Sequence, residues 1–142
     1  MDPVVKIVQR MNNSKLRYVR MFWHYWLRVI YACDIMPGTK IGNGCKFPHR
    51  GLGVVINQDA VIGDNVKIAC NVTIGGSTGN PVVPRIGNNV EIGAGALIFG
   101  PITIGDGAVI GAGCVCNKNC PAHAVMVGNP CRILKYLNNG TN

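Results

Sequence analysis

The stretch IGNNVEIGAGALIFGPITIGDGAVIGAGCV, residues 86–115, repeats a six-residue pattern without a break. Each hexad begins with isoleucine, usually followed by glycine, and has a small or branched residue at its fifth position. A strand alternates every two residues and a helix about every 3.6, so a strict period of six fits neither element. The pattern predicts short strands joined by tight turns, with isoleucine pointing inward and glycine allowing the turn conformations.

The pattern extends on both sides of this stretch. Hexads start at Ile35 with IMPGTK and IGNGCK, resume at Ile56 with INQDAV, IGDNVK and IACNVT, and end with CNKNCP at Pro121. A hexapeptide repeat of this kind resembles the left-handed parallel β-helix, in which three hexads make one coil of about 18 residues. We therefore expect a mainly β protein with about five coils, a column about 24 Å tall at about 4.8 Å per coil.

Two segments interrupt the repeat. The stretch KFPHRGLGVV (46–55) holds three residues more than the period allows, and GGSTGNPVVPR (75–85) keeps the phase but loses the pattern. Coils that bury a continuous core cannot absorb such segments, so both are predicted to project as loops. The first loop carries His49, the one histidine that lies within the repeat.

The residues before the repeat have a different composition. Residues 16–32, LRYVRMFWHYWLRVIYA, lack glycine and proline and are predicted to be helical, but they are too short to span a bilayer. Two interpretations stay open: this helix packs on the β-helix or on a neighbouring subunit, or it lies in a membrane interface. His24 is interpreted as a tolerated side chain of an amphipathic helix. The predicted division is an arm (1–33), a repeat domain (34–137) with loop 75–85, and a polar tail (138–142).

The formal net charge of +8 is spread without a cluster of basic residues, which argues against a nucleic-acid partner. The chain has seven cysteines and no recognisable signal peptide, so we expect free thiols and a cytoplasmic protein. Peripheral contact with the inner membrane surface stays open as an alternative to a fully cytoplasmic location. Cys45, Cys114 and Cys120 take the small fifth position and Cys116 the first, as buried residues would. Cys70 is predicted to point outward. No cysteine or histidine spacing indicates a metal site.

Four segments resemble the serine acetyltransferase family of hexapeptide acyltransferases. They are DIMPGTKIGNG (34–44), HRGLGVVI (49–56), NVTIGG (71–76) and VGNPCR (127–132), and the resemblance runs from about residue 34 to 135. Short chains of this kind are also similar to the acetyltransferases of capsule and exopolysaccharide gene clusters. The resemblance implies that a large helical domain is reduced here to the short arm.

The resemblance implies a homotrimer with active sites between subunits, acetyl-CoA along the groove between neighbouring β-helices, and direct transfer of acetyl to a hydroxyl. His49 matches the general base of the family and Asp34 its orienting carboxylate. A histidine near neutrality can take the proton of the attacking hydroxyl, and a carboxylate fixes its tautomer. The amides of Gly75 and Gly76 are expected to hold the developing oxyanion. No metal is implied.

The expected acetyl-CoA contacts fall into two groups. Small residues suit a groove for the pantetheine chain, and basic residues suit the phosphates of the cofactor. The first group is Gly75, Gly76, Ala94, Gly95, Ala112 and Gly113, and the second is Arg85, Arg132 and Lys135. For the small residues, ordinary turn positions remain an equal alternative.

Three positions depart from the family. Serine acetyltransferases carry an aspartate immediately before the catalytic histidine, and an arginine-histidine pair before the proline that begins the next hexad after the loop. At these places this chain has Pro48, Val82 and Val83. Groups that would hold a charged amino acid are missing, so the predicted acceptor is a sugar hydroxyl of a polysaccharide intermediate. The alternative is serine itself. A γ-type carbonic anhydrase needs three converging histidines, and a single histidine in the repeat argues against it.

Overall fold

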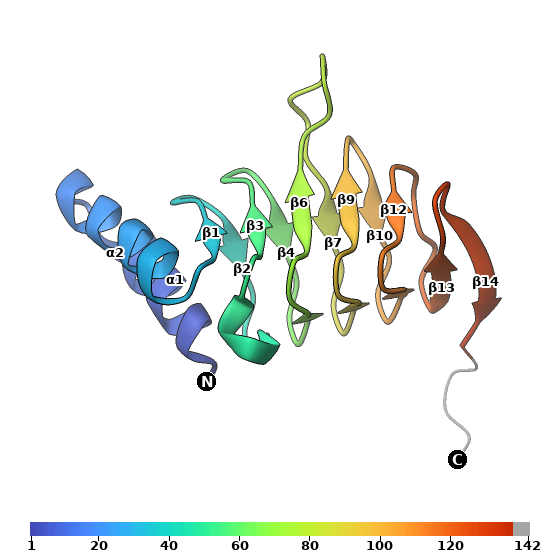
Figure 1. Ribbon diagram of the computed structural model, residues 1–142, viewed down its shortest axis with the longest axis horizontal. Helices are drawn as coiled ribbons and strands as arrows, with labels where there is room; N and C mark the ends of the chain where they lie inside the picture. The colour runs from blue at the N-terminus through green and yellow to red at the C-terminus, as the bar shows by residue number, and fades with distance from the viewer. Residues whose placement is uncertain (138–142) are drawn as a thin grey trace.

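The computed structural model describes residues 1–137, which form two helices followed by a column of short strands (Figure 1). The predicted tail at 138–142 lies outside the described residues. The helices are α1 (Pro3–Asn13) and α2 (Arg17–Ile30), and a short 3-10 helix, η1 (Pro48–Gly51), follows β2. The strands are β1 (Asp34–Ile35), β2 (Lys40–Ile41), β3 (Val55–Ile56), β4 (Val61–Ile62), β5 (Lys67–Ile68), β6 (Thr73–Gly75), β7 (Arg85–Ile86), β8 (Glu91–Ile92), β9 (Leu97–Phe99), β10 (Thr103–Ile104), β11 (Val109–Ile110), β12 (Val115–Cys116), β13 (Ala124–Val127) and β14 (Arg132–Tyr136).

The strands form three sheets, in the orders β1-β3-β6-β9-β12, β10-β7-β4-β2 and β14-β13-β11-β8-β5. All pairs are parallel except β13 with β14. The first isoleucine of each hexad stacks on the isoleucine of the next coil, as in Ile35 on Ile56 and Ile56 on Ile74. These side chains are fully or almost fully buried except Ile41, which is partly buried, so the period of six encodes one continuous core.

The predicted β-helix is confirmed, with about four turns between β1 and β12. After β12 the chain adds one more level, through an isolated bridge between Cys120 and Ile104 and then β13. β14 turns back antiparallel to β13 and closes this end of the column. Because the hexads stop at Pro121, the repeat gave no indication of this terminal hairpin.

Helix α1 closes the opposite end of the column. Its buried residues are Val4, Val5, Ile7, Val8 and Met11, which recur at helical spacing and join the core of the β-helix. The Asp2 side chain caps the helix by accepting from the Val4 amide at 2.9 Å, and its second oxygen accepts from the Phe47 amide at 2.9 Å. The helix thus covers apolar surface that a terminal coil would otherwise expose.

Helix α2 lies across β1 and confirms the helix predicted in 16–32. It buries His24 and Leu27, and it packs against α1 and β1. Its other face is apolar and open, with Tyr18 88% exposed and Val29 77% exposed beside the half-exposed Phe22, Tyr25 and Trp26. None of the helices within residues 1–137 has the length and apolarity needed to cross a membrane. The arm is therefore docked on one side and unpartnered on the other.

Both irregular segments lie where the repeat predicts loops. Residues after β6 form an excursion that projects from the column before β7 begins, with Ser77 and Asn80 paired in a tight turn (Figure 1). The other segment folds into η1, next to the end of the column that α1 covers. Neither loop changes the strand register. After the first loop, Ile56 of β3 still pairs with Ile35 of β1, and after the second, Ile86 of β7 pairs with Ile62 of β4.

Candidate active site

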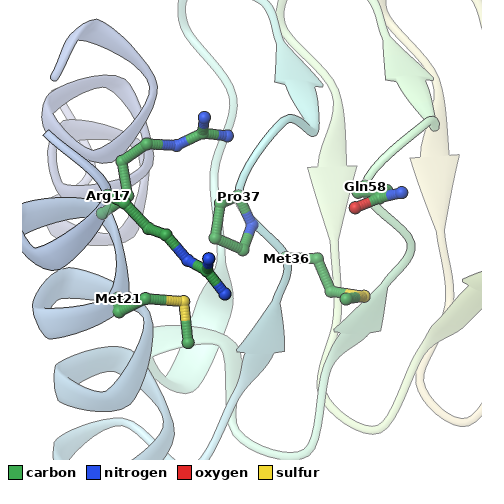
Figure 2. A pocket seen from close by; sticks show the side chains of 6 residues that line it. Arg17, Met21, Met36, Pro37 and Gln58 are labelled. Atoms are coloured by element: carbon green, nitrogen blue, oxygen red, sulfur yellow. The ribbon is translucent and has the colours of Figure 1, made fainter. Parts of the chain in front are cut away.

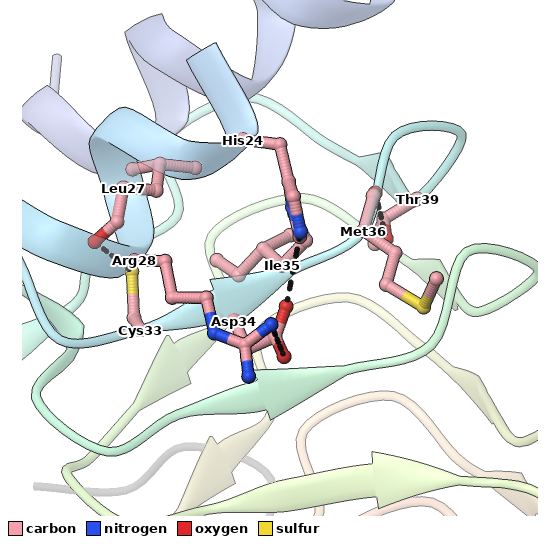
Figure 3. Close-up of polar contacts among 8 residues, drawn as sticks. All are labelled: His24, Leu27, Arg28, Cys33, Asp34, Ile35, Met36 and Thr39. Atoms are coloured by element: carbon pink, nitrogen blue, oxygen red, sulfur yellow. Dashed lines mark hydrogen bonds and ion pairs between the residues drawn. The ribbon is translucent and has the colours of Figure 1, made fainter. Parts of the chain in front are cut away.

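Asp34 is the first residue of β1, and its carboxylate faces helix α2. Its Oδ1 atom lies 3.6 Å from Nε2 of His24, and its Oδ2 atom lies 3.5 Å from a terminal guanidinium nitrogen of Arg28 (Figure 3). Oδ1 is buried and accepts no hydrogen bond within the described residues. The carboxylate of Asp34 thus lies against two side chains of α2, and its Oδ1 atom can still accept a hydrogen bond.

His24 is a site residue that the sequence interpretation missed. The idea of a tolerated amphipathic side chain is wrong, because the ring is only 7% exposed and contacts two oxygens of β1. Nδ1 lies 3.3 Å from the Ile35 carbonyl oxygen, while Nε2 faces the Asp34 carboxylate. Both ring nitrogens therefore face oxygen atoms of β1. The spacing of His24 and Arg28, four residues apart on one helix face, was the available signal.

His49 lies in η1, where the backbone is strained. His49 has φ 55° and the next residue, Arg50, has φ 58°, so two consecutive residues with side chains occupy the left-handed region. Such conformations cost free energy and are often found at functional sites. The Arg50 guanidinium lies 5.9 Å from the ring centre of Tyr31, which ties the loop to the end of α2. The His49 side chain is exposed, as a base that meets a substrate must be.

The loop that carries His49 runs alongside the strand that carries Asp34. The Gly53 amide donates to the Ala32 carbonyl at 2.8 Å, and the Asp34 amide donates to the Val54 carbonyl at 2.8 Å. The two predicted residues therefore belong to neighbouring, hydrogen-bonded segments. Within residues 1–137 the ion pairs of Asp34 are with His24 and Arg28, so a direct contact between Asp34 and His49 stays a prediction.

A thiol next to this site is unsuited to covalent catalysis. Cys33 precedes Asp34 and is buried. Burial, with a smaller contribution from the nearby charges of Asp34 and Asp2, raises the pKa of the Cys33 thiol to about 12. The thiol stays protonated near neutral pH, so it is a poor nucleophile.

Four of the predicted acetyl-CoA contacts form a ledge on one corner of the column: Ala94, Gly95, Ala112 and Gly113. They stack on successive coils, because the Gly113 amide donates to the Ala94 carbonyl at 2.9 Å. A Cβ atom at Gly95 or Gly113 would meet nothing within 4 Å, so open space lies beside the ledge. A cleft of about 260 Å³ that includes Ala112 adjoins it on the face formed by β5, β8 and β11. The ledge suits a narrow chain such as pantetheine.

The other predicted contacts lie elsewhere. Arg132 and Lys135 are exposed on β14, and the Arg132 guanidinium reaches to 3.4 Å from a Cβ placed on Gly128, close to the end of the ledge. Gly75 ends β6 and Gly76 begins the projecting loop, where the Gly100 amide donates to the Gly75 carbonyl at 3.1 Å. Arg85 is exposed on β7, in another sheet. One chain therefore does not gather all the predicted contacts at one place.

The loop positions that depart from the family carry no charge themselves, and the nearest charged side chain after them is Arg85. Val82 is 54% exposed in the projecting loop, Val83 is buried, and residues 76–84 contain no charged side chain. Pro48 begins η1 directly before His49. Residues 1–137 also contain no group of three or more His, Cys, Asp or Glu side chains that could hold a metal ion.

Comparisons with known proteins agree with this architecture. The family model described as bacterial transferase hexapeptide (six repeats) matches residues 84–118. Serine acetyltransferase 2 of Arabidopsis thaliana is 40% identical over 135 residues, 93% of this chain and 41% of that protein. Serine acetyltransferase of Escherichia coli (strain K12) is 40% identical over 124 residues, 86% of this chain and 45% of that protein. The chain thus spans less than half the length of these relatives.

Solved structures of serine acetyltransferases superimpose on most of the chain. The soybean enzyme complexed with serine has a TM-score of 0.86 at 38% identity, covering 92% of this chain and 56% of that one. A serine acetyltransferase in complex with CoA has a TM-score of 0.85 at 32% identity, covering 92% of this chain and 55% of that one. The repeat, the fold and these similarities together show that the chain belongs to the hexapeptide-repeat transferase family, in which it is similar to serine acetyltransferases.

Proposed function

We propose that this chain transfers the acetyl group of acetyl-CoA to the hydroxyl of L-serine. The observation that carries the proposal is the similarity to serine acetyltransferases across more than nine-tenths of the chain, which includes His49 and Asp34. The expected acceptor from the sequence was a sugar hydroxyl, and the relatives reported above favour the serine alternative instead. The strained, exposed His49 beside the Asp34 strand supplies the chemistry that either acceptor requires.

In the proposed reaction His49 takes the proton of the acceptor hydroxyl as its oxygen attacks the thioester carbonyl. The new C–O bond forms, the tetrahedral oxyanion collapses, and the C–S bond breaks to release the thiolate of CoA. The imidazolium then returns its proton to this leaving group. Asp34 stabilises the imidazolium through its charge, and Arg28 and His24 hold the carboxylate in place.

We infer that the active enzyme is a homotrimer, because the predicted acetyl-CoA contacts lie on two corners of one column. A neighbouring column that brings its projecting loop to the ledge would join Gly75, Gly76 and Arg85 to Ala94 and Gly113. The Gly75 and Gly76 amides would then approach the thioester oxygen, as an oxyanion hole requires. Sedimentation at micromolar concentration is expected to give a trimer, and a monomer would refute the shared site.

A sugar hydroxyl remains a second candidate acceptor, favoured by one observation. The three positions that serine acetyltransferases use for charged contacts are Pro48, Val82 and Val83 here, and Val83 is buried in the chain itself. An uncharged acceptor would need no ionic partner at these places. Release of CoA thiol over a panel of serine, homoserine, monosaccharides and oligosaccharides separates the two candidates. Turnover confined to sugars would refute the serine proposal.

His123 provides a matched control for substitution of the proposed general base, His49. His49 and His123 both have left-handed φ values, 55° and 58°, a conformation that asparagine tolerates. We expect His49→Asn to lower kcat/KM for the best acceptor by at least about 100-fold, because a positioned base contributes at least that factor. His123→Asn is expected to stay close to the unsubstituted enzyme. Equal activity of the two variants would refute the role of His49.

A further inference from the structure

A cleft of about 320 Å³ separates the beginning of α2 from the first two coils. Arg17, Arg20 and Met21 line it from the helix, and Met36, Pro37 and Gln58 line it from the turns after β1 and β3. Figure 2 shows Arg17 and Met21 on one side of this space, with Pro37, Met36 and Gln58 on the other. The cleft plays no part in the acetyl transfer described above.

The helix end at this cleft lacks the negative charge that usually stabilises it. The N-cap residue, Leu16, has no side-chain oxygen, and the first turn of α2 contains no acidic residue. Instead, that turn holds both arginines of the cleft. The N-terminal end of a helix carries a partial positive charge, so cations placed there are unfavourable unless an anion joins them.

Within residues 1–137 the two arginines also lack an ionic partner. The Nε atom of Arg20 is buried and has no hydrogen-bond partner within the described residues. The Asp34 carboxylate lies next to His24 and Arg28, further along the same helix, and forms no ion pair with the first turn. Asp59 follows Gln58 in sequence, but no ion pair joins it to Arg17 or Arg20 in residues 1–137. A buried guanidinium nitrogen without an acceptor costs free energy, which a bound oxyanion would recover.

We propose that this cleft binds a phosphate monoester carried by a molecule with an apolar part. Two guanidinium groups and the helix end match the double negative charge of a phosphate monoester better than the single charge of a carboxylate. The Gln58 amide adds a further donor, and Met21, Met36 and Pro37 give the apolar part a surface to cover. The site is separate from the proposed serine and acetyl-CoA contacts.

Phenyl phosphate is the probe that tests this site, with no acetyl-CoA present. Calorimetric titration of the full chain at constant ionic strength is expected to show binding that Arg17→Gln/Arg20→Gln weakens at least about tenfold, the loss of charge-assisted hydrogen bonds. The matched control, Lys6→Gln/Lys118→Gln, removes the same charge from exposed lysines and is expected to keep the affinity. Arg20→Lys keeps the charge but loses Nε, so weaker binding is expected there too.

Two results would overturn the proposed phosphate site. Absence of phenyl phosphate binding, or equal weakening in both double variants, would show that the cleft is not the site. Benzoate, which has the same ring and a single charge, is expected to bind several-fold more weakly than phenyl phosphate. Equal affinity for benzoate would refute the preference for phosphate. Circular dichroism of each variant checks that α2 is retained, and serine acetylation, measured separately, tests the proposed function independently.

The phosphate could belong to a soluble molecule or to a lipid headgroup, and one further measurement separates these sources. Vesicles of phosphatidylcholine containing phosphatidic acid are floated with the full chain, with and without phenyl phosphate. A lipid source predicts that phenyl phosphate and Arg17→Gln/Arg20→Gln both reduce flotation. A soluble ligand predicts that neither changes flotation while calorimetric binding is still lost in the variant.

Discussion

At the scale of single residues, the carboxylate of Asp34 links the arm to the repeat domain. Its Oδ1 atom faces an imidazole and its Oδ2 atom a guanidinium, both supplied by α2. The Arg28 side chain is mostly exposed, so water screens its charge, whereas His24 is buried. We therefore expect His24 to be the contact that matters for stability.

Substitution of His24 tests this difference. His24→Ala leaves the buried Oδ1 atom of Asp34 without its neighbour and opens space under α2, and the expected cost is about 1–3 kcal/mol of unfolding free energy. Arg28→Ala is expected to cost less than about 1 kcal/mol. Urea unfolding followed by circular dichroism measures both, with Lys6→Ala as an exposed control. An equal cost for His24→Ala and Arg28→Ala would contradict the assignment.

At the scale of secondary-structure elements, the two helices of the arm differ in how much apolar surface they bury. Helix α1 buries five apolar residues in the core, whereas α2 buries two residues and leaves an aromatic face open. The sequence interpretation offered packing or membrane contact for residues 16–32, and the observed docking on β1 satisfies only the inner face. Membrane-surface contact through the outer face of α2, on the inner side of a cytoplasmic membrane, remains our proposal.

Flotation tests the outer face directly. Substitution of Phe22, Trp26 and Val29 by serine removes apolar surface that is exposed already, so the fold is expected to survive. If α2 lies in a membrane interface, the triple variant should lose most of its binding to anionic liposomes. A matched variant with Val55 and Leu97 changed to serine alters exposed apolar residues of the column and should still float. Unchanged flotation of the α2 variant would leave only packing against another subunit.

The coils and loops of this fold are predictable from the sequence, whereas the arm is predictable only in part. The period of six predicts the coils and both loops, because each hexad encodes its own strand and turn. Helix α1 was missed as a separate element, although Asp2 followed by Pro3 is a typical helix start and its apolar residues recur at helical spacing. The pairing of His24 with Asp34 could not be predicted, since it depends on how α2 docks on β1. The corner positions of the acetyl-CoA candidates likewise emerge only once the coils are stacked.

At the scale of the whole molecule, the core is unusually rich in thiols. Six of the seven cysteines are buried, Cys70 is the partly exposed one, and all are free. The hexad positions predict four of the buried ones and the outward Cys70, whereas Cys33 and Cys131 lie outside the hexads. Burial raises the pKa of Cys116 to about 12 and that of Cys120 to about 11, and it also raises the pKa of Cys45 and Cys114. The folded protein therefore holds protons that the unfolded chain would release in alkali.

This difference sets the expected pH dependence of stability. Below pH 9, the ordinary pKa of these thiols, both states are protonated and the thiols contribute no pH dependence. Between pH 9 and about 12 the unfolded chain ionises first, so unfolding becomes easier by at most about 1.4 kcal/mol per pH unit for each such cysteine. Urea titrations from pH 8 upward measure the slope. Cys116→Val is expected to flatten it, and a slope unchanged by that substitution would contradict this explanation.

The two hydrogen bonds of Asp2 have a consequence for the order of events during synthesis. One carboxylate caps α1 and also holds the Phe47 amide at the entrance to η1, so the second residue of this chain needs the forty-seventh to complete its contacts. The apolar residues of helix α1 join a core made of coils that emerge later from the ribosome, and the helix also packs against α2. We therefore expect the arm to dock after the first coils have formed, a sequence of steps that protease protection of ribosome-bound chains of increasing length would reveal.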